Sequence, residues 1–563
     1  MAVRIFAMKA KSITSKDLKL LLRLLHPLIP DLSTDPRTLR KTPRRVEKIE
    51  LTNGCYIHLG LKSSLRMLLP DHKILNDMRL YLQLNIDGIR VYDYPGTEMW
   101  PILGKIVQPF NSGPFVVGCY SGRGKPEPLS DYLNAVVQDL DTALSDGIQL
   151  TELITVQISL QCIICDSVAR SYIRQVKSHV SYNGCDKCLE RGCRITGHRT
   201  SFINCDSENR NDGTFRSKID FNHHIGLSPF ERLPIDMVKS FPLDPMHLVY
   251  LGVVKRILTL WKTAERGTNI RLSGSQTRQI ESQLSLAAKQ LTVDFPRKCA
   301  SFQIHERWKA TECRQFLLYL GPVVLKHSLH PKVYNNFVLL SSIMYALSHP
   351  KRYREMLPTL RLLITRFIKQ YKKLYGLDQV VYNIHCLSHI CDDVELYGPL
   401  ERFSAFPFES YMRVLKGDVK GPKCPATQLY NRITERAQVQ DTFPHSFYDD
   451  IHNSLACKLN KSFHVVHENL VISPKPPDNC FMQNGIPHLI MSIDGSLAHC
   501  KRFVNLCNLY EHAFPSSDFS IFIASSLSIT TFIIPLDNFS SKCLCFTQDN
   551  SYYIFPIIHT IKK

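Results

Sequence analysis

The chain has no long apolar run. Its N-terminal stretch, MAVRIFAMKAKSITSKDLKLLL, reaches its charges before any apolar segment of signal-peptide length. Residues 519–535 are the most apolar later stretch, but their Ser, Thr and β-branched side chains favour strands over a lipid-facing helix. We therefore expect an intracellular protein with no membrane partner.

The sequence also has no internal repeat and no disordered composition. Of its 563 residues, 44% are hydrophobic and 21% are charged. Both fractions are ordinary for a globular protein, and the hydrophobic fraction is too high for a chain that stays unfolded. The length is enough for several structural units, each with a core of its own.

Acidic residues are in deficit. The chain has 50 Asp and Glu against 69 Lys and Arg, which leaves a formal net charge of +19. Basic surface binds nucleic acid because neutralised phosphates release their counterions. The charge therefore predicts a polyanionic partner, with nucleic acid as the best fit, although a merely solubilising charge is the alternative.

Cysteine, in contrast, is plentiful. The chain has 19 Cys, and inside a reducing compartment structural disulfides rarely persist. Most of these residues are therefore expected to be free thiols or metal ligands, and their spacing carries the information.

The hydrophobic pattern changes several times along the chain. A helical and basic region is followed by alternating strand patterns, then by helical periodicity, and finally by short β-like runs of unknown role. The expected parts are residues 1–78, residues 79–225, a helical part at 226–398, a closing helix at 399–440, and a C-terminal region at 441–563.

Two basic stretches are candidate contacts for a phosphate backbone. The first is a Pro-broken segment that includes Arg40, Arg44 and Arg45, and the second is a helix that carries Arg366 and Lys369. Charge runs of this kind are also common on surfaces that only face solvent. The sequence alone does not decide between these two interpretations.

Two predicted strands end in an acid. Residues 80–86 alternate between apolar and polar side chains and lead to Asp87, while residues 155–165 form a longer β-rich run that leads to Asp166. Strand ends hold side chains rigidly, so both carboxylates are candidate ligands for Mg²⁺ in two-metal phosphodiester chemistry. The alternative is that both acids are ordinary loop residues, because polar side chains are common where a strand ends and a loop begins.

A third acid, Glu409, lies on a predicted helix. Pro407 suits the first turn of that helix, and Glu409, Arg413 and Lys416 would share one face, with an acid for metal and two cations for phosphate. Taken alone, Glu409 also fits an ordinary surface glutamate. Asp244 is a rival third acid, but its position just before a helix suits an N-terminal cap.

Several segments together resemble a known family. They are similar to a group of animal transposase-domain proteins and, through them, to the CACTA (En/Spm) superfamily of DNA transposases; the resemblance covers about residues 15–440. The segments are NIDGIRVY, MWPILG, KPEPLSDYL, ICDSVARSYI, NGCDKC, FPLDPMHLVYLGVVKR, RWKATECRQFLLYLGPVVL and HCLSH followed by GPLERFSAFPFESYMRVLK.

The resemblance implies a fold and an activity. The fold would be an α/β, RNase H-like core interrupted by a large all-α insertion domain. Asp87, Asp166 and Glu409 would bind Mg²⁺ or Mn²⁺ and catalyse DNA cleavage and strand transfer at transposon ends. The partners would be transposon-end and target DNA, the protein would be a nuclear homodimer or higher oligomer, and the helix of Glu409 would close the core.

Two other functions remain open. One is a domesticated descendant that binds DNA or chromatin without cutting it, because intact acids can survive in a chain that has lost other parts. The other is a zinc-stabilised scaffold for protein interactions in which the carboxylates are structural.

A Cys-x-x-Cys pair and a histidine pair are candidate zinc ligands. Cys185 and Cys188 can hold one Zn²⁺ between two thiolates, and His385 and His389 would lie on one face of a helix. Similar placement in the related Transib and immune-recombinase transposases implies one long-range Cys₂His₂ site, which would hold the Glu409 helix near the two aspartates. A local alternative combines the cysteine pair with Cys193 and His198.

Overall fold

The computed structural model has mixed α/β architecture. It divides into two compact units, each built from separate segments of the chain. Unit 1 comprises Met1–Val176, Asn211–Pro242 and Ala405–Leu455, and unit 2 comprises Lys177–Arg210, Leu243–Ser404 and Ala456–Lys563. The structure describes residues 2–9, 13–69, 73–92, 96–197, 199–440, 464–466 and 470–562.

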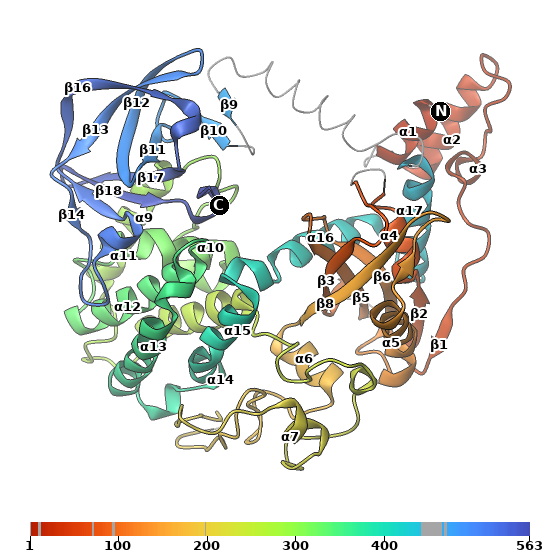
Figure 1. The fold of residues 1–563 in the computed structure, drawn as a ribbon, viewed down its shortest axis with the longest axis horizontal. Coiled ribbons are helices and arrows are strands. Elements are labelled where there is room, and N and C mark those ends of the chain that lie inside the picture. Colours follow the sequence, from red (N-terminus) through yellow and green to blue (C-terminus); the bar gives the residue numbers. More distant parts are fainter. Residues whose placement is uncertain are drawn as a thin grey trace. The chain divides into compact units, whose positions relative to one another are not determined.

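Unit 1 is organised around a mixed sheet of eight strands (Figure 1). The order is β1-β2-β6-β5-β3-β8-β7, with β4 paired to β5. The β3–β8 pair is parallel, and the other pairs are antiparallel. The strands are β1 (Ile49–Leu51), β2 (Gly54–His58), β3 (Arg79–Ile86), β4 (Ile89–Tyr92), β5 (Thr97–Gln108), β6 (Phe115–Arg123), β7 (Ile148–Gln149) and β8 (Thr155–Ile164).

Strand β3 is central because it pairs on both sides. It runs between β5 and β8, and from Leu82 to Ile86 every residue is buried. Helix α5 (Leu129–Ser145) packs on this sheet through a stripe of apolar residues, which includes Tyr132, Val136 and Leu140 at helical spacing. This packing forms the main core of unit 1.

Short helices complete unit 1. The N-terminal three form a small apolar cluster of their own, centred on Ala7, Leu18 and Leu22. The helices are α1 (Ala2–Lys9), α2 (Ser15–Leu25), α3 (Pro36–Arg40), α4 (Leu61–Arg66), α6 (Ser167–Arg174), α7 (Asp212–Arg216), the 3₁₀ turn η1 (Pro229–Arg232), α16 (Phe406–Asp418) and α17 (Pro425–Gln440).

Unit 2 contains the predicted block of helices. Helix α12 (Pro331–Ser348) is buried on nearly all sides, as a central helix of a bundle should be. The others are η2 (Met246–Val254), α8 (Lys255–Thr263), α9 (Gly274–Lys289), η3 (Phe302–Arg307), α10 (Ala310–Gln315), η4 (Phe316–Leu320), α11 (Gly321–Val324), α13 (Tyr353–Tyr375), η5 (Leu377–Gln379), α14 (Tyr382–His385), η6 (Cys386–His389), α15 (Ile390–Tyr397) and η7 (Leu400–Phe403).

The C-terminal part of unit 2 is a second sheet of eight strands, in the order β14-β15-β18-β17-β11-β12-β13-β16. Most of residues 519–535 form strands here, as their composition predicts, and no helix among the described residues is long and apolar enough to cross a membrane. The strands are β11 (Cys480–Gln483), β12 (Ile486–Asp494), β13 (Leu497–Val504), β14 (Cys507–Asn508), β15 (Phe522–Ala524), β16 (Ser526–Pro535), β17 (Ser541–Gln548) and β18 (Ser551–Pro556).

A few short elements flank this sheet. Strands β9 (His464–Val466) and β10 (Leu470–Ile472) pair only with each other. Of three 3₁₀ turns in this part, two lie between strands and the third follows the last strand. They are η8 (Ser516–Phe519), η9 (Leu536–Asn538) and η10 (Ile558–Thr560).

Candidate active site and metal centre

Asp87 and Asp166 lie at the same edge of the unit 1 sheet. Strands β3 and β8 run parallel with Asn85 opposite Ile164, so the continuation of that register puts Asp87 level with Asp166. The carboxyl ends of neighbouring parallel strands are a common place for functional side chains. The structure thus places both predicted acids where a metal site could form.

Glu409 lies near Asp87, although it belongs to the last of the three chain segments that form unit 1. It lies in the first turn of α16, after Pro407, and the apolar face of that helix, with Phe408, Met412 and Leu415, is buried. A carboxylate oxygen of Glu409 and one of Asp87 lie within 4.8 Å of each other. Two half-buried carboxylates at this separation can share one hard cation such as Mg²⁺.

Asp166 is not part of this close pair. Among the described residues it belongs to no group of ligands whose atoms all lie within 4.8 Å of one another. Instead its side chain caps α6, because Oδ1 accepts a 2.6 Å hydrogen bond from the backbone N–H of Ala169. The structure therefore brings together two of the three predicted acids and gives the third a capping role.

The rival acid, Asp244, also acts as a helix cap. It is buried, and its carboxylate accepts hydrogen bonds from the backbone N–H groups of Met246 and His247 at 3.1 and 3.0 Å. Its Oδ2 also lies 2.6 Å from Nδ1 of His247. These bonds satisfy the first N–H groups of η2, which is the capping role that its position in the sequence predicts.

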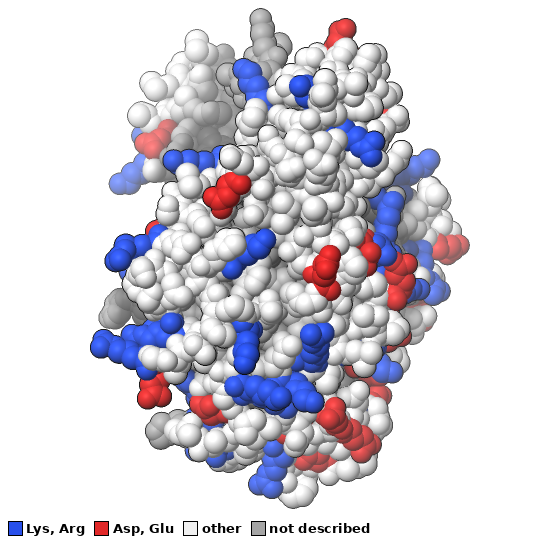
Figure 2. All heavy atoms as spheres, turned by 90° about the vertical axis from the view of Figure 1, so that its left-hand side faces the viewer, with Lys and Arg blue, Asp and Glu red and all other residues white. Residues whose placement is uncertain are grey.

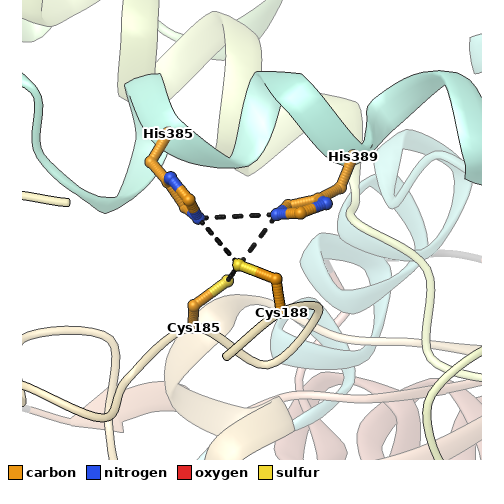
Figure 3. A group of neighbouring side chains, drawn as sticks. All are labelled: Cys185, Cys188, His385 and His389. Atoms are coloured by element: carbon orange, nitrogen blue, oxygen red, sulfur yellow. Dashed lines mark hydrogen bonds between the residues drawn. The ribbon is translucent and has the colours of Figure 1, made fainter. Parts of the chain in front are cut away.

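The Cys and His residues of unit 2 form a tight, buried cluster. Figure 3 shows the imidazoles of His385 and His389 pointing from one helical segment toward the sulfurs of Cys185 and Cys188. The two sulfurs are 3.5 Å apart and the two Nε2 atoms 3.4 Å apart. Sulfur–nitrogen distances are 3.3 Å for Cys188–His385 and 3.8 Å for Cys185–His389.

These distances fit the ligand shell of a tetrahedral metal. With Zn–S near ~2.3 Å and Zn–N near ~2.05 Å, a regular tetrahedron separates two sulfurs by about 3.8 Å, sulfur and nitrogen by about 3.6 Å, and two nitrogens by about 3.4 Å. All four side chains are buried. The cluster can therefore hold a metal ion such as zinc.

The protonation of the cluster follows from its contacts. Burial would raise the pKa of the Cys185 thiol, but hydrogen bonds from Cys188, Cys386 and the two imidazoles outweigh it and hold that pKa well below its ordinary value. Burial lowers the pKa of His385, but hydrogen bonds and charge interactions with Cys185 and Cys205 outweigh it and raise the pKa to about 10. Positive charge is thus favoured beside the Cys185 thiolate. A bound metal ion would supply that charge, and its binding would release the protons held by the cysteine and histidine ligands.

The local alternative for the zinc site does not assemble. Cys193 does not join the group that contains Cys185 and Cys188, and its backbone instead pairs with that of Ser201. His198 lies outside the described residues. The histidine pair, distant in sequence, takes the places that the local model assigns to Cys193 and His198.

Both residues between the two cysteines are bonded to the histidine-bearing segment. The hydroxyl of Tyr382 donates to Oδ1 of Asp186 at 2.8 Å, and Nζ of Lys187 donates to Oδ1 of Asp393 at 3.0 Å. Sequence reasoning missed these contacts. The available signal was the presence of two opposite charges inside a motif whose cysteines are buried.

No protein-family model matches this chain. No curated protein matches it either. The geometry of the two clusters and the charge of the surface are therefore the observations on which its function can be argued.

The predicted phosphate contacts of unit 1 differ in exposure. Arg44, Arg45 and Arg413 are exposed. Lys416 is exposed as well, and its Nζ donates to the carbonyl of Arg90 at 3.0 Å. Arg40 is buried and donates to the carbonyl of Ala7. Its guanidinium group therefore stabilises the packing of the N-terminal helices and does not lie on the surface as a predicted phosphate contact should.

The predicted contacts of unit 2 lie on α13. Arg366 and Lys369 are exposed there. Arg366 also donates to the carbonyl of His512 at 3.1 Å, so one of its hydrogen-bond donors is already used within unit 2. Figure 2 shows one face of the molecule, on which Lys and Arg side chains gather in the lower half. Basic surface is thus present on unit 2 as well as on unit 1.

Proposed function

We propose that this chain is a transposon-derived DDE transposase that cleaves DNA at the ends of a mobile element and transfers the strand to target DNA. The observation that carries the proposal is the approach of the Asp87 and Glu409 carboxylates to within 4.8 Å. These acids come from a strand end and a helix that are far apart in the sequence. Two carboxylates at this separation repel each other, and a divalent cation shared between them would offset that repulsion.

The strand order supports an RNase H-like core for this site. Strands β6, β5, β3 and β8 are neighbours in that order, with β6, β5 and β3 antiparallel and β8 parallel to β3. Helix α5 lies between β6 and β8 in the sequence. This is the arrangement that the resemblance to CACTA transposases implies, with its first and fourth strands leading to Asp87 and Asp166.

Each acid has a distinct role in the proposed reaction. Asp87 and Glu409 would bind Mg²⁺ or Mn²⁺, and Asp166 would complete the site with the carboxylate lone pairs that its capping bond leaves available. When bound, the divalent cations supply charge stabilisation for in-line attack on a phosphodiester. Arg413, one helical turn beyond Glu409, would hold a neighbouring phosphate of the same strand.

The cysteine and histidine cluster would bind Zn²⁺ as a structural ion. Its four ligands join the loop of Cys185 and Cys188 to the helical segment of His385 and His389 within unit 2. A closed set of four protein ligands leaves no position for substrate, which is typical of structural zinc. The ion would thus contribute stability and not chemistry.

A nicking assay tests the proposed activity. The full chain, supplied with DNA that carries the element's own terminal repeats, should nick that DNA when Mg²⁺ or Mn²⁺ is added and should be inactive with EDTA. Asp87→Asn and Glu409→Gln should lower nicking by at least ~10²-fold, since each removes a metal ligand. Asp141→Asn, at an exposed position on α5, should retain full activity.

A second candidate is a domesticated protein that binds DNA without cutting it. The capping bond of Asp166 favours this alternative, because that acid has a structural reason to persist without catalysis. DNA binding by the unaltered chain, with no nicking under any tested divalent metal, would support this second function and refute the first.

A further inference from the structure

Unit 1 contains a large groove, and Arg413 is the one described lining residue that also has a role in the catalytic proposal. The groove has a volume of about 2000 Å³ and lies between the N-terminal helices on one side and α16 and α17 on the other. The lining residues that the structure describes all belong to unit 1. The groove is therefore a feature of one compact unit.

The lining of this groove is strongly basic. Among the described residues that line it, eleven are Lys or Arg and two, Asp35 and Asp418, are acidic. Both acids already have partners: Asp35 caps α3, and Asp418 forms two bonds with the guanidinium of Arg436. The exposed cations that line the groove are Lys16, Lys19, Arg37, Lys41, Arg44, Lys48, Arg413 and Lys420.

Buried polar contacts hold the two walls of the groove together. Glu435 of α17 is fully buried; it accepts a hydrogen bond from the hydroxyl of Thr42, and its Oε2 lies 2.6 Å from Nη1 of Arg432. Arg4 donates to Oε1 of Gln438 at 3.0 Å. The basic residues thus face a preformed groove and not a flexible tail.

The other lining residues favour the backbone of a duplex over a single strand. Among the described residues that line the groove, none is Phe, Tyr or Trp, whereas proteins that bind single strands stack bases on aromatic rings. Hydroxyl and amide side chains stand between the cations instead. These are Thr14, Ser15, Thr38, Thr42, Thr427, Gln428 and Asn431, and such groups commonly bond to phosphate oxygens.

Helix α16 connects this groove with the acidic pair. Glu409 lies in its first turn and Arg413 one turn later, and Arg413, Val414, Gly417 and Asp418 all line the groove. A strand that passes Arg413 is thus one helical turn from the carboxylate of Glu409.

We infer that this groove binds the sugar–phosphate backbone of the duplex DNA next to the scissile phosphate. The inference takes DNA as the partner from the proposed function, but it assigns the binding surface independently of any cleavage. It adds Lys16, Lys19, Lys41 and Lys420 to the residues that contact DNA. Binding here is expected to be independent of base sequence and strongly dependent on salt.

Fluorescence anisotropy with the full chain tests this surface. The probe is a 25-base-pair duplex of arbitrary sequence, titrated in EDTA at several salt concentrations, so that neither metal binding nor nicking affects the result. The triple variant Lys16→Gln, Arg44→Gln, Lys420→Gln should bind at least ~10-fold more weakly. The slope of log K against log salt should become shallower by about 3, because three phosphates are no longer neutralised by a cation.

A matched control separates the groove from the general positive charge. Lys62→Gln, Lys73→Gln, Arg79→Gln removes the same charge from exposed positions of unit 1 that do not line the groove. Equal loss of affinity in this control would overturn the inference, and so would tighter binding to the single strand or to duplex RNA of the same length. If the groove variant loses affinity but the unaltered chain never nicks DNA, the groove stands and the catalytic proposal fails.

Discussion

Lys187 and Asp393 form a buried ion pair beside the cysteine and histidine cluster, with Nζ 3.0 Å from Oδ1 and both side chains at least 92% buried. The other carboxylate oxygen of Asp393 accepts a 2.8 Å hydrogen bond from the backbone N–H of Leu243. Lys187 lies between the two cysteines. One carboxylate therefore ties together three segments of unit 2.

Removal of this carboxylate should be costly. Asp393→Asn would remove the counter-charge that this carboxylate gives the buried ammonium group of Lys187, and breaking a buried pair typically lowers the free energy of unfolding by about 3–5 kcal/mol. Urea denaturation measures the loss. Asp392→Asn is the control. The carboxylate of Asp392 forms a half-buried pair with Arg361, which also pairs with Glu395, so its loss should cost less than ~1 kcal/mol. Equal losses in the two variants would contradict a stabilising role of the buried pair.

Zinc content should depend on residues that are far apart in the sequence. We expect Cys188→Ser and His389→Ala each to lose most of the zinc that the purified protein carries, as measured by mass spectrometry, because each removes one of four ligands. Cys193→Ser should retain it. Loss of zinc from the Cys193 variant, with retention in the His389 variant, would favour the local site instead.

The stability of unit 2 should fall in mild acid through His349. Burial, with smaller contributions from Arg352 and Lys351, lowers the pKa of His349 to about 4. Its Nδ1 lies 3.3 and 3.2 Å from the backbone N–H groups of Lys351 and Arg352, which donate to it. Since the unfolded histidine binds its proton near ~6.5, the neutral form stabilises the fold above that pH.

This stabilisation is lost as the pH falls from about 6.5 to about 4. The free energy of unfolding should decrease by about 1.4 kcal/mol for each pH unit in that range because of this one group. His349→Asn retains an acceptor for the same N–H groups and should have a pH profile that is flatter by this amount. His327→Asn, at an exposed position of the same unit, should leave the profile of the unaltered chain intact; equal flattening would refute the assignment.

The close approach of β2 to β6 should require Gly118. A Cβ atom built there would lie 2.0 Å from the hydroxyl oxygen of Tyr56, which is fully buried and bonded to Nδ1 of His58 at 2.9 Å. Gly118→Ala should therefore lower the free energy of unfolding by about 1–3 kcal/mol, the usual cost of overpacking. Gly113→Ala is the control, because nothing lies within 4 Å of its built Cβ, and a comparable loss there would contradict this explanation.

Local pattern was enough to predict much of the architecture. Alternating side chains place β3 before Asp87, a β-rich run places β8 before Asp166, and Pro407 with its apolar neighbours predicts the helix of Glu409. Strand and helix periodicity depends on neighbouring residues only. For the same reason local pattern gives the Cys-x-x-Cys loop and the histidine pair as separate features, and only the resemblance implied that they form one Cys₂His₂ site.

Only the tertiary structure decided which of these features meet. It pairs Cys185 and Cys188 with His385 and His389, and it brings Glu409 to Asp87 while Asp166 caps α6. It also buries Arg40, and it builds the basic groove from helices that are far apart in the sequence of unit 1. The physical reason is that contacts between residues far apart in the sequence depend on how the whole core packs. Forming them closes long loops of the chain, and the spacing of neighbouring residues does not determine which loops close.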